Sequence, residues 1–210
     1  MIEVSDLAYA YGPQHPKLFR SLNYRFDASQ VHVIRGPNGV GKSTLLRILA
    51  TLVRPTDGEV KFNGESSAKA IAGHVRNRIA FSAGAPLGFY PRLNAYDNLT
   101  FFASIKGISL SPDQIDELGE RVGLGLAALA KKFHEYSLGM RQRLHLARLL
   151  LPTNDFFLVD EITNGLDVDG VELCRRLLTE ELVGKTRILV SHDAHFVKSL
   201  DPKILELKLS

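Results

Sequence analysis

The residues best suited to chemistry form one glycine-rich run, GPNGVGKST, between the apolar stretch VHVIR and an apolar helical pattern. A loop that joins a strand to a helix in this way can surround phosphate oxygens with backbone N–H groups. The Lys42 ammonium would face the β and γ phosphates, and the Ser43 hydroxyl would bind Mg²⁺. A glycine turn that only caps a helix would not require Lys42 and Ser43 together. The run predicts a nucleotide phosphate site formed by Gly36, Pro37, Asn38, Gly39, Val40, Gly41, Lys42, Ser43 and Thr44.

Three further polar residues follow apolar, strand-like runs. Asp160 and Glu161 end FFLVDE, and His192 lies in ILVSHD. In isolation the two carboxylates could belong to a turn, and a lone histidine is usually structural. Beside a phosphate loop we expect Asp160 to hold Mg²⁺ through water and Glu161 to polarise an attacking water. His192 would donate a hydrogen bond to the γ phosphate from the same crevice.

A second segment that could bind an anion is HEYSLGMRQRLHL, residues 134–146. Apolar residues from Met140 to Leu151 recur at helical spacing, which predicts a basic helix that begins near Leu138 and ends before Pro152. We expect the N-terminus of this helix to be bare and positive. Ser137 lies where either a helix cap or a phosphate ligand would lie, and the segment alone leaves both open.

The elements that must position these residues alternate between strand and helix, which predicts an α/β fold with a mixed or parallel sheet. The expected strands cover residues 2–4, 31–35, 59–62, 79–82, 156–160, 187–191 and 203–209. From about residue 93 to residue 151 the pattern is helical only, and it includes a capping box at Ser111. We therefore expect one domain over residues 1–210, with N-terminal β elements. Its core would comprise residues 1–92 and 152–210, and residues 93–151 would form an inserted helical subdomain.

The composition is that of an ordinary folded protein. The chain has 210 residues, 45% of them hydrophobic, and a net charge of +3 without a long single-sign run. We therefore expect a large core and no nucleic-acid partner. Cys174 is the only cysteine, which excludes an internal disulfide and fits a reducing compartment. No stretch has the length of a membrane span and no signal peptide begins the chain, so we expect an unexported, soluble protein.

Four of these motifs, in the same order, resemble the nucleotide-binding subunit of an ATP-binding cassette (ABC) transporter. GPNGVGKST is similar to the family's phosphate loop, YSLGMRQR to its signature segment, FFLVDE to its metal-and-base strand, and ILVSHD to its switch histidine. The resemblance covers nearly the whole chain. It implies a P-loop nucleotide-hydrolase core, ATP and Mg²⁺ as cofactors, catalytic roles for Glu161 and His192, and Ser43 and Asp160 as metal ligands.

The resemblance also implies a head-to-tail dimer, formed with a second copy or with a homologous ATPase subunit. Ser137 and Gly139 would then contact the partner's γ phosphate. Asp167, in TNGLD, matches the loop that links the two active sites. Tyr11, in YAYG, matches the aromatic residue that stacks on adenine. Tyr9 is the alternative, and only the glycine after Tyr11 favours Tyr11.

Two positions depart from the family pattern. The commonest signature is Ser-Gly-Gly-Gln, whereas this chain has SLGM, a form similar to that of drug, polysaccharide and haem exporters. The family also has a glutamine after the strand that corresponds to IAFS, where it approaches Mg²⁺ and relays the nucleotide state to the membrane subunit. Here no glutamine occurs between Gln30 and Gln114, and Gly84 or Ala85 takes its place. The chain therefore lacks the side chain through which the family usually contacts Mg²⁺ and relays the nucleotide state to the membrane subunit.

We interpret the chain as the ATP-hydrolysing subunit of an ABC transporter that powers a separate membrane permease, with export favoured. It would lie in the cytoplasm on the inner face of the membrane. One alternative is a non-transport ABC ATPase. The DNA-repair members of that class insert long coiled coils, and this chain lacks the heptad pattern that would indicate one. The other alternative is a slow nucleotide-dependent regulator, which the missing glutamine leaves open.

Overall fold

The computed structural model describes residues 1–208, except for the side chain of Ala72. A four-stranded antiparallel sheet has the order β2-β1-β4-β5, with β1 (Ile2–Tyr9), β2 (Phe19–Phe26), β4 (Asp57–Phe62) and β5 (Glu65–Ser66). The sequence predicted only parts of β1 and β4. It missed β2 because this edge strand is mostly exposed, and a positive φ at Ser21 and irregular pairing with β1 interrupt its alternation.

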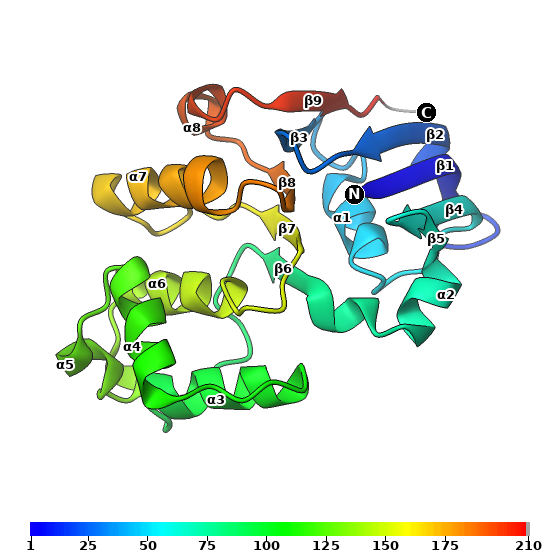
Figure 1. Cartoon of the computed structure of the whole chain (residues 1–210). Coiled ribbons are helices and arrows are strands. Elements are labelled where there is room, and N and C mark those ends of the chain that lie inside the picture. The colour runs from blue at the N-terminus through cyan, green and yellow to red at the C-terminus, as the bar shows by residue number, and fades with distance from the viewer. Residues whose placement is uncertain (209–210) are drawn as a thin grey trace.

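A second sheet has five parallel strands in the order β6-β7-β8-β3-β9 (Figure 1). Its strands are β6 (Ile79–Ala83), β7 (Phe156–Asp160), β8 (Thr186–Val190), β3 (Val31–Arg35) and β9 (Lys203–Glu206). Each of them was predicted. The predicted strand at 203–209 is too long, because β9 ends at Glu206, and Leu209 lies outside the described residues. Strands β7 and β8 are buried almost throughout, as their apolar runs predict.

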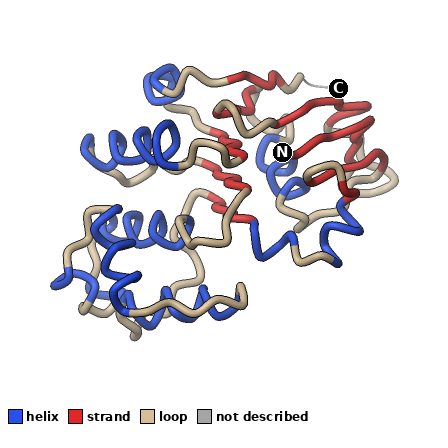
Figure 2. Tube along the Cα trace, viewed as in Figure 1, coloured by secondary structure: helices blue, strands red, loops and turns tan. Residues whose placement is uncertain are grey.

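Helices cover both faces of the parallel sheet (Figures 1 and 2). Helix α1 (Lys42–Leu49) lies between the two sheets and shares one apolar cluster with both. On the other face pack α7 (Val168–Arg176), its π-helical continuation η3 (Leu177–Glu181), and α8 (Ala194–Ser199). The short α2 (Ser67–Ala72) and η1 (Val75–Arg78) join the two sheets. Among the described residues no helix has the length and apolarity needed to cross a bilayer.

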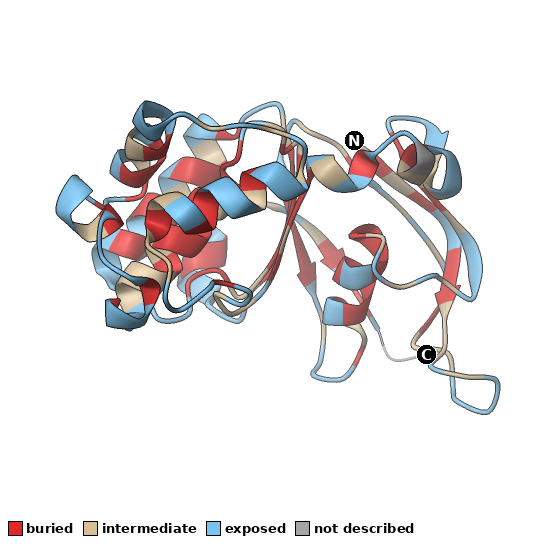
Figure 3. Ribbon diagram, turned by 90° about the horizontal axis from the view of Figure 1, so that it is seen from below, coloured by how far each residue is buried: buried red, intermediate tan, exposed pale blue. Residues whose placement is uncertain are grey.

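The segment from residue 95 to residue 149 is helical, as its periodicity predicts. It contains α3 (Ala95–Ile105), α4 (Pro112–Arg121), α5 (Leu126–Leu129), η2 (Phe133–Glu135) and α6 (Leu138–Leu149). The capping box predicted at Ser111 is present. Figure 3 shows that the buried residues of these helices face inward, and they belong to the same apolar cluster as the outer face of the parallel sheet. Helix α6 therefore packs directly on the core that carries the site.

Candidate active site

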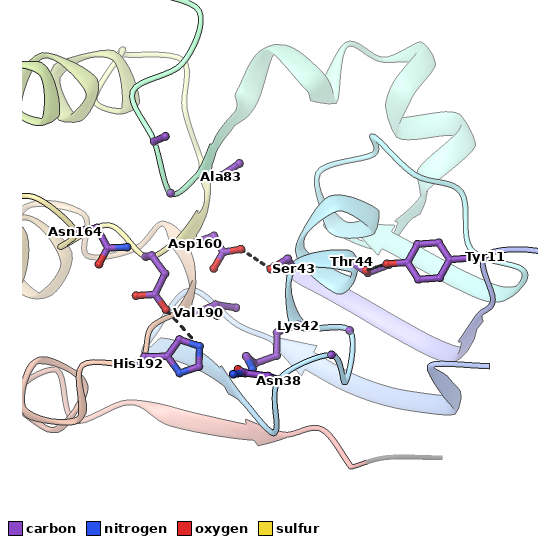
Figure 4. Close-up of a pocket in the computed structure, with 15 residues that line it drawn as sticks. Tyr11, Asn38, Lys42, Ser43, Thr44, Ala83, Asp160, Asn164, Val190 and His192 are labelled. Atoms are coloured by element: carbon purple, nitrogen blue, oxygen red, sulfur yellow. Dashed lines mark hydrogen bonds and ion pairs between the residues drawn. The ribbon is translucent and has the colours of Figure 1, made fainter. Parts of the chain in front are cut away.

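The carboxyl ends of β3, β6, β7 and β8 surround one pocket of about 660 Å³ (Figure 4). Parallel strands present these ends at the same edge of the sheet, which is where ligands bind in open α/β folds. The neighbouring pairs Ala83–Asp160 and Asp160–Val190 bring three of these ends side by side. The pocket is lined by Tyr11, Asn38, Gly39, Gly41, Lys42, Ser43, Thr44, Ala83, Gly84, Ala85, Asp160, Glu161, Asn164, Val190 and His192.

The phosphate loop wraps the N-terminus of α1. Gly41 takes the N-cap position with φ +104°, and no side chain caps the helix. The first-turn N–H groups therefore remain available to an anion. The Lys42 Nζ atom donates to the carbonyl oxygens of Gly36 and Pro37 at 2.8 and 3.0 Å, which holds the ammonium inside the loop. Val40 is buried in the apolar cluster around α1 and thereby anchors the loop to the core.

Close backbone packing explains the first glycine of the loop. A Cβ atom at Gly36 would lie 2.5 Å from the carbonyl oxygen of Leu207, so no larger residue fits between the loop and the end of β9. Gly39, in contrast, has open space around it and a φ of +79°, so its backbone conformation rather than crowding requires glycine.

Ser43 and Asp160 form the second part of the site. The Ser43 Oγ atom donates to Asp160 Oδ2 at 2.6 Å, across the boundary between α1 and β7. A hydroxyl and a carboxylate side by side are oxygen ligands of the kind that Mg²⁺ takes together with nucleotide phosphates. These two residues therefore fit the metal role that the sequence predicts for them. Next to them, the Tyr11 hydroxyl lies 2.9 Å from Thr44 Oγ1, whereas Tyr9 packs behind Tyr11 and does not line the pocket.

Glu161 and His192 lie next to each other in the pocket, with 3.8 Å between Glu161 Oε1 and His192 Nε2. Glu161 has a φ of +49°, a conformation that costs an ordinary residue about 1–3 kcal/mol and that turns the residue away from the strand direction. Its Oε1 atom is buried and accepts no hydrogen bond. Burial raises the pKa of the Glu161 carboxyl, and the nearby His192 opposes that shift. A carboxylate with an unused acceptor and a raised pKa is suited to take a proton from water.

Six predicted site residues do not line this pocket: Gly36, Pro37 and Val40 belong to the phosphate loop itself, whereas Ser137, Gly139 and Asp167 lie on other segments. The prediction of a bare α6 N-terminus is wrong, because Ser137 Oγ caps the helix by accepting from Met140 N at 3.3 Å. Asp167 caps α7 through Gly170 N and pairs with Arg143. A Cβ atom on Gly139 would have open space, with the Gly165 carbonyl 4.0 Å away. Within one chain, the signature segment does not reach the phosphate loop.

Asn164 lines the pocket, and the sequence did not single it out. Its side chain, labelled in Figure 4, is drawn among those that line the pocket. The buried Gln142 of α6 holds this loop, because its Nε2 atom donates to the Asn164 carbonyl at 2.5 Å. Asn164 belongs to TNGLD, so the motif was found, but only Asp167 was selected from it.

The fold and the pocket together define a P-loop nucleotide-binding protein. The ABC transporter family model matches residues 19–164. The bacitracin transport ATP-binding protein of Bacillus licheniformis is 35% identical over 96% of this chain, and the match spans 63% of that relative's own length. The cytochrome c biogenesis ATP-binding export protein of Haemophilus influenzae is 35% identical over 83% of this chain and 82% of that protein. A bacterial ABC transporter cassette solved as a dimer superposes with a TM-score of 0.80, at 25% identity, over 99% of this chain and 94% of that one. The chain therefore belongs to the ABC transporter family, as one of its ATP-binding ATPase cassettes.

Proposed function

We propose that the chain hydrolyses ATP to ADP and phosphate and thereby powers a separate membrane permease that exports its substrate. The observation that carries this proposal is the buried Glu161 Oε1 atom, which accepts no hydrogen bond and lies in the same pocket as Lys42, Ser43 and Asp160. Glu161 would accept a proton from water while the water oxygen bonds to the γ phosphorus. The bond from that phosphorus to the β–γ bridging oxygen breaks, and ADP leaves with the electron pair.

The other residues of the pocket bind and orient the nucleotide. Lys42 would exchange its two carbonyl partners for β and γ phosphate oxygens, and the uncapped turn of α1 would donate its N–H groups. His192 would donate to the γ phosphate, and the exposed Tyr11 ring would stack on adenine. Ser43 and Asp160 would hold Mg²⁺, which supplies positive charge to the phosphates when it is bound.

We propose that Ser137, Gly139 and Asp167 complete the site of a second ATPase subunit. All three are exposed or half-exposed in the single chain and lie outside its own pocket. Only the Ser137 side chain is used by the helix cap, so further N–H groups of the first α6 turn stay available to a partner's phosphate. In this arrangement residues 93–151 act as a helical subdomain of one ATPase domain.

A permease would contact an apolar patch on the helical segment, which would place the chain on the inner face of the membrane. The patch consists of Leu87, Tyr90, Phe101 and Ile105, of which Leu87 and Ile105 are 66% and 62% exposed. The Tyr90 and Phe101 rings pack edge to face at 4.8 Å, so the loop after β6 and α3 present one surface. Export rests on the relatives, whose names include bacitracin transport and a cytochrome c biogenesis export protein.

Steady-state hydrolysis of ATP by the purified chain, with Glu161→Gln as the matched inactive variant, tests the proposal. Turnover that requires Glu161 supports it. Binding of ATP without turnover would favour the alternative, a nucleotide-dependent regulator, for which the absence of a glutamine at positions 84 and 85 is the motivating observation.

A further inference from the structure

The loop after β6 connects the nucleotide pocket to the apolar patch. Gly84 and Ala85 line the pocket, while Leu87 and Tyr90 belong to the patch. Neither Gly84 nor Ala85 has a side chain that could bind a nucleotide or a metal. Any influence of this loop on the pocket must therefore depend on how its backbone is held.

Helix α6 contacts the chain on both sides of those two residues, at Ser82 near the end of β6 and at Leu87 in the loop. The Ser82 hydroxyl and His145 Nε2 lie 2.6 Å apart, both residues being 2% exposed. On the other side, the Arg148 guanidinium donates to the Leu87 carbonyl at 2.7 Å and contacts His145 Nδ1 at 3.0 Å. Because a guanidinium only donates, His145 Nδ1 accepts, and His145 Nε2 carries the proton that Ser82 Oγ accepts.

Arg148 is itself fixed by its surroundings. Its guanidinium carbon lies 5.0 Å from the centre of the Phe89 ring and 4.7 Å from that of Phe102. Phe89 belongs to the loop and Phe102 to α3, so Arg148 joins α6, α3 and the loop. Burial and the neighbouring Arg148 charge lower the pKa of His145 to about 3, which keeps its imidazole neutral near pH 7. The contacts are therefore constant over the physiological pH range.

We propose that Arg148, supported by His145, is the positioning residue that places Gly84 and Ala85 in the nucleotide pocket. It ties their backbone to α6, the helix that carries the signature segment. A displacement of α6 would then move this wall of the pocket through the main chain, without a glutamine side chain. Only the expected effect of Arg148 on ATP turnover rests on the proposed function.

The test compares Arg148→Met with Arg187→Met. Arg187 is a matched control: it is 2% exposed and donates to the carbonyls of Lys185, Leu178 and Ala28, at the opposite end of β8 from the pocket. Arg148→Lys keeps the charge but not the planar fork, and it serves if the methionine variant fails to fold. Hydrogen exchange of the amides of residues 83–90 is measured without nucleotide, followed by kcat and KM for ATP.

For Arg148→Met we expect exchange in residues 83–90 to rise about tenfold, the scale of one lost charge-assisted hydrogen bond, with no such rise in Arg187→Met. We expect kcat to fall about tenfold while KM changes less than about twofold. Arg148→Lys should lie between wild type and Arg148→Met. Unchanged exchange in residues 83–90, or an equal rise in both methionine variants, would overturn the inference. A wild-type chain without turnover would instead refute the proposed function, because the exchange measurement does not depend on hydrolysis.

Discussion

The N-termini of α1 and α6 differ although both were predicted to bind phosphate. The α1 terminus begins at a left-handed Gly41, has no side-chain cap and opens into the pocket. The α6 terminus is capped by Ser137, and neither Ser137 nor Gly139 lines that pocket. The first terminus therefore has its ligand site within the chain. The second has none there, so a phosphate at this terminus would have to belong to a partner subunit.

The largest expected effect is on ATP affinity, from a substitution in the phosphate loop at the N-terminus of α1. Lys42→Ala removes the ammonium that two loop carbonyls hold in place while leaving the glycine loop intact. We expect ATP affinity to fall at least about 100-fold, because a buried, charge-assisted phosphate contact is lost. Equilibrium binding of a fluorescent ATP analogue measures the affinity, with Lys61→Ala, a half-exposed lysine of β4, as the control. Unchanged affinity would show that Lys42 has only a structural role.

The second prediction separates binding from chemistry at the same pocket. Glu161→Gln should bind ATP normally but hydrolyse it roughly 100-fold more slowly, because it removes the general base. Since burial raises the pKa of Glu161 and the base acts when ionised, turnover of the wild type should decline with falling pH earlier than for an exposed glutamate. The pH profile of kcat measures this, and a normal rate in Glu161→Gln would exclude Glu161 as the base.

The sequence predicted well which residues gather around the N-terminus of α1, because their positions follow from short, contiguous motifs. The residues from Gly36 to Thr44 are contiguous. Asp160 ends the apolar strand β7 and His192 lies two residues after β8, and the ends of these parallel strands must meet. Asn164 was missed because its place depends on Gln142, 22 positions earlier in the chain. The cap made by Ser137 could not be distinguished from a phosphate ligand, because the same hydroxyl serves either role. Strand β2 was missed because its exposed edge position and its irregular register with β1 interrupt the alternation of apolar and polar residues.

A mixture of two variants tests whether the N-terminus of α6 serves a partner's site. Lys42→Ala disables a chain's own phosphate loop, and Gly139→Asp adds bulk and negative charge only to the signature it would lend. Neither variant alone should form an ATP-bound dimer. Mixed together, they can form a heterodimer with one intact site, so ATP-dependent dimerisation should partly return in sedimentation or light scattering.

Dimerisation is the right measurement, because two sites that hydrolyse only cooperatively would leave the mixture inactive even with correct geometry. Each variant's melting temperature is the control for folding. If the folded mixture dimerises no better than its components, Ser137 and Gly139 have no role in a partner's site and serve only the N-terminus of α6.

The smallest effect is expected where the loop after β6 meets the pocket. Gly84 has a φ of +82°, and a Cβ atom there would lie 3.4 Å from the Asp160 carbonyl oxygen, so a side chain at this position is strained. Ala85 has an ordinary backbone and lines the pocket, which makes it the better position for the missing glutamine. We expect Ala85→Gln to raise the apparent Mg²⁺ affinity or kcat by about two- to threefold, the scale of one weak, solvent-accessible contact. Titration of ATPase activity with Mg²⁺ measures both, and Ala85→Leu controls for added bulk. An identical response to Gln and Leu would mean that a side chain at position 85 does not reach Mg²⁺. The position in which Arg148 holds the loop would then not serve metal binding.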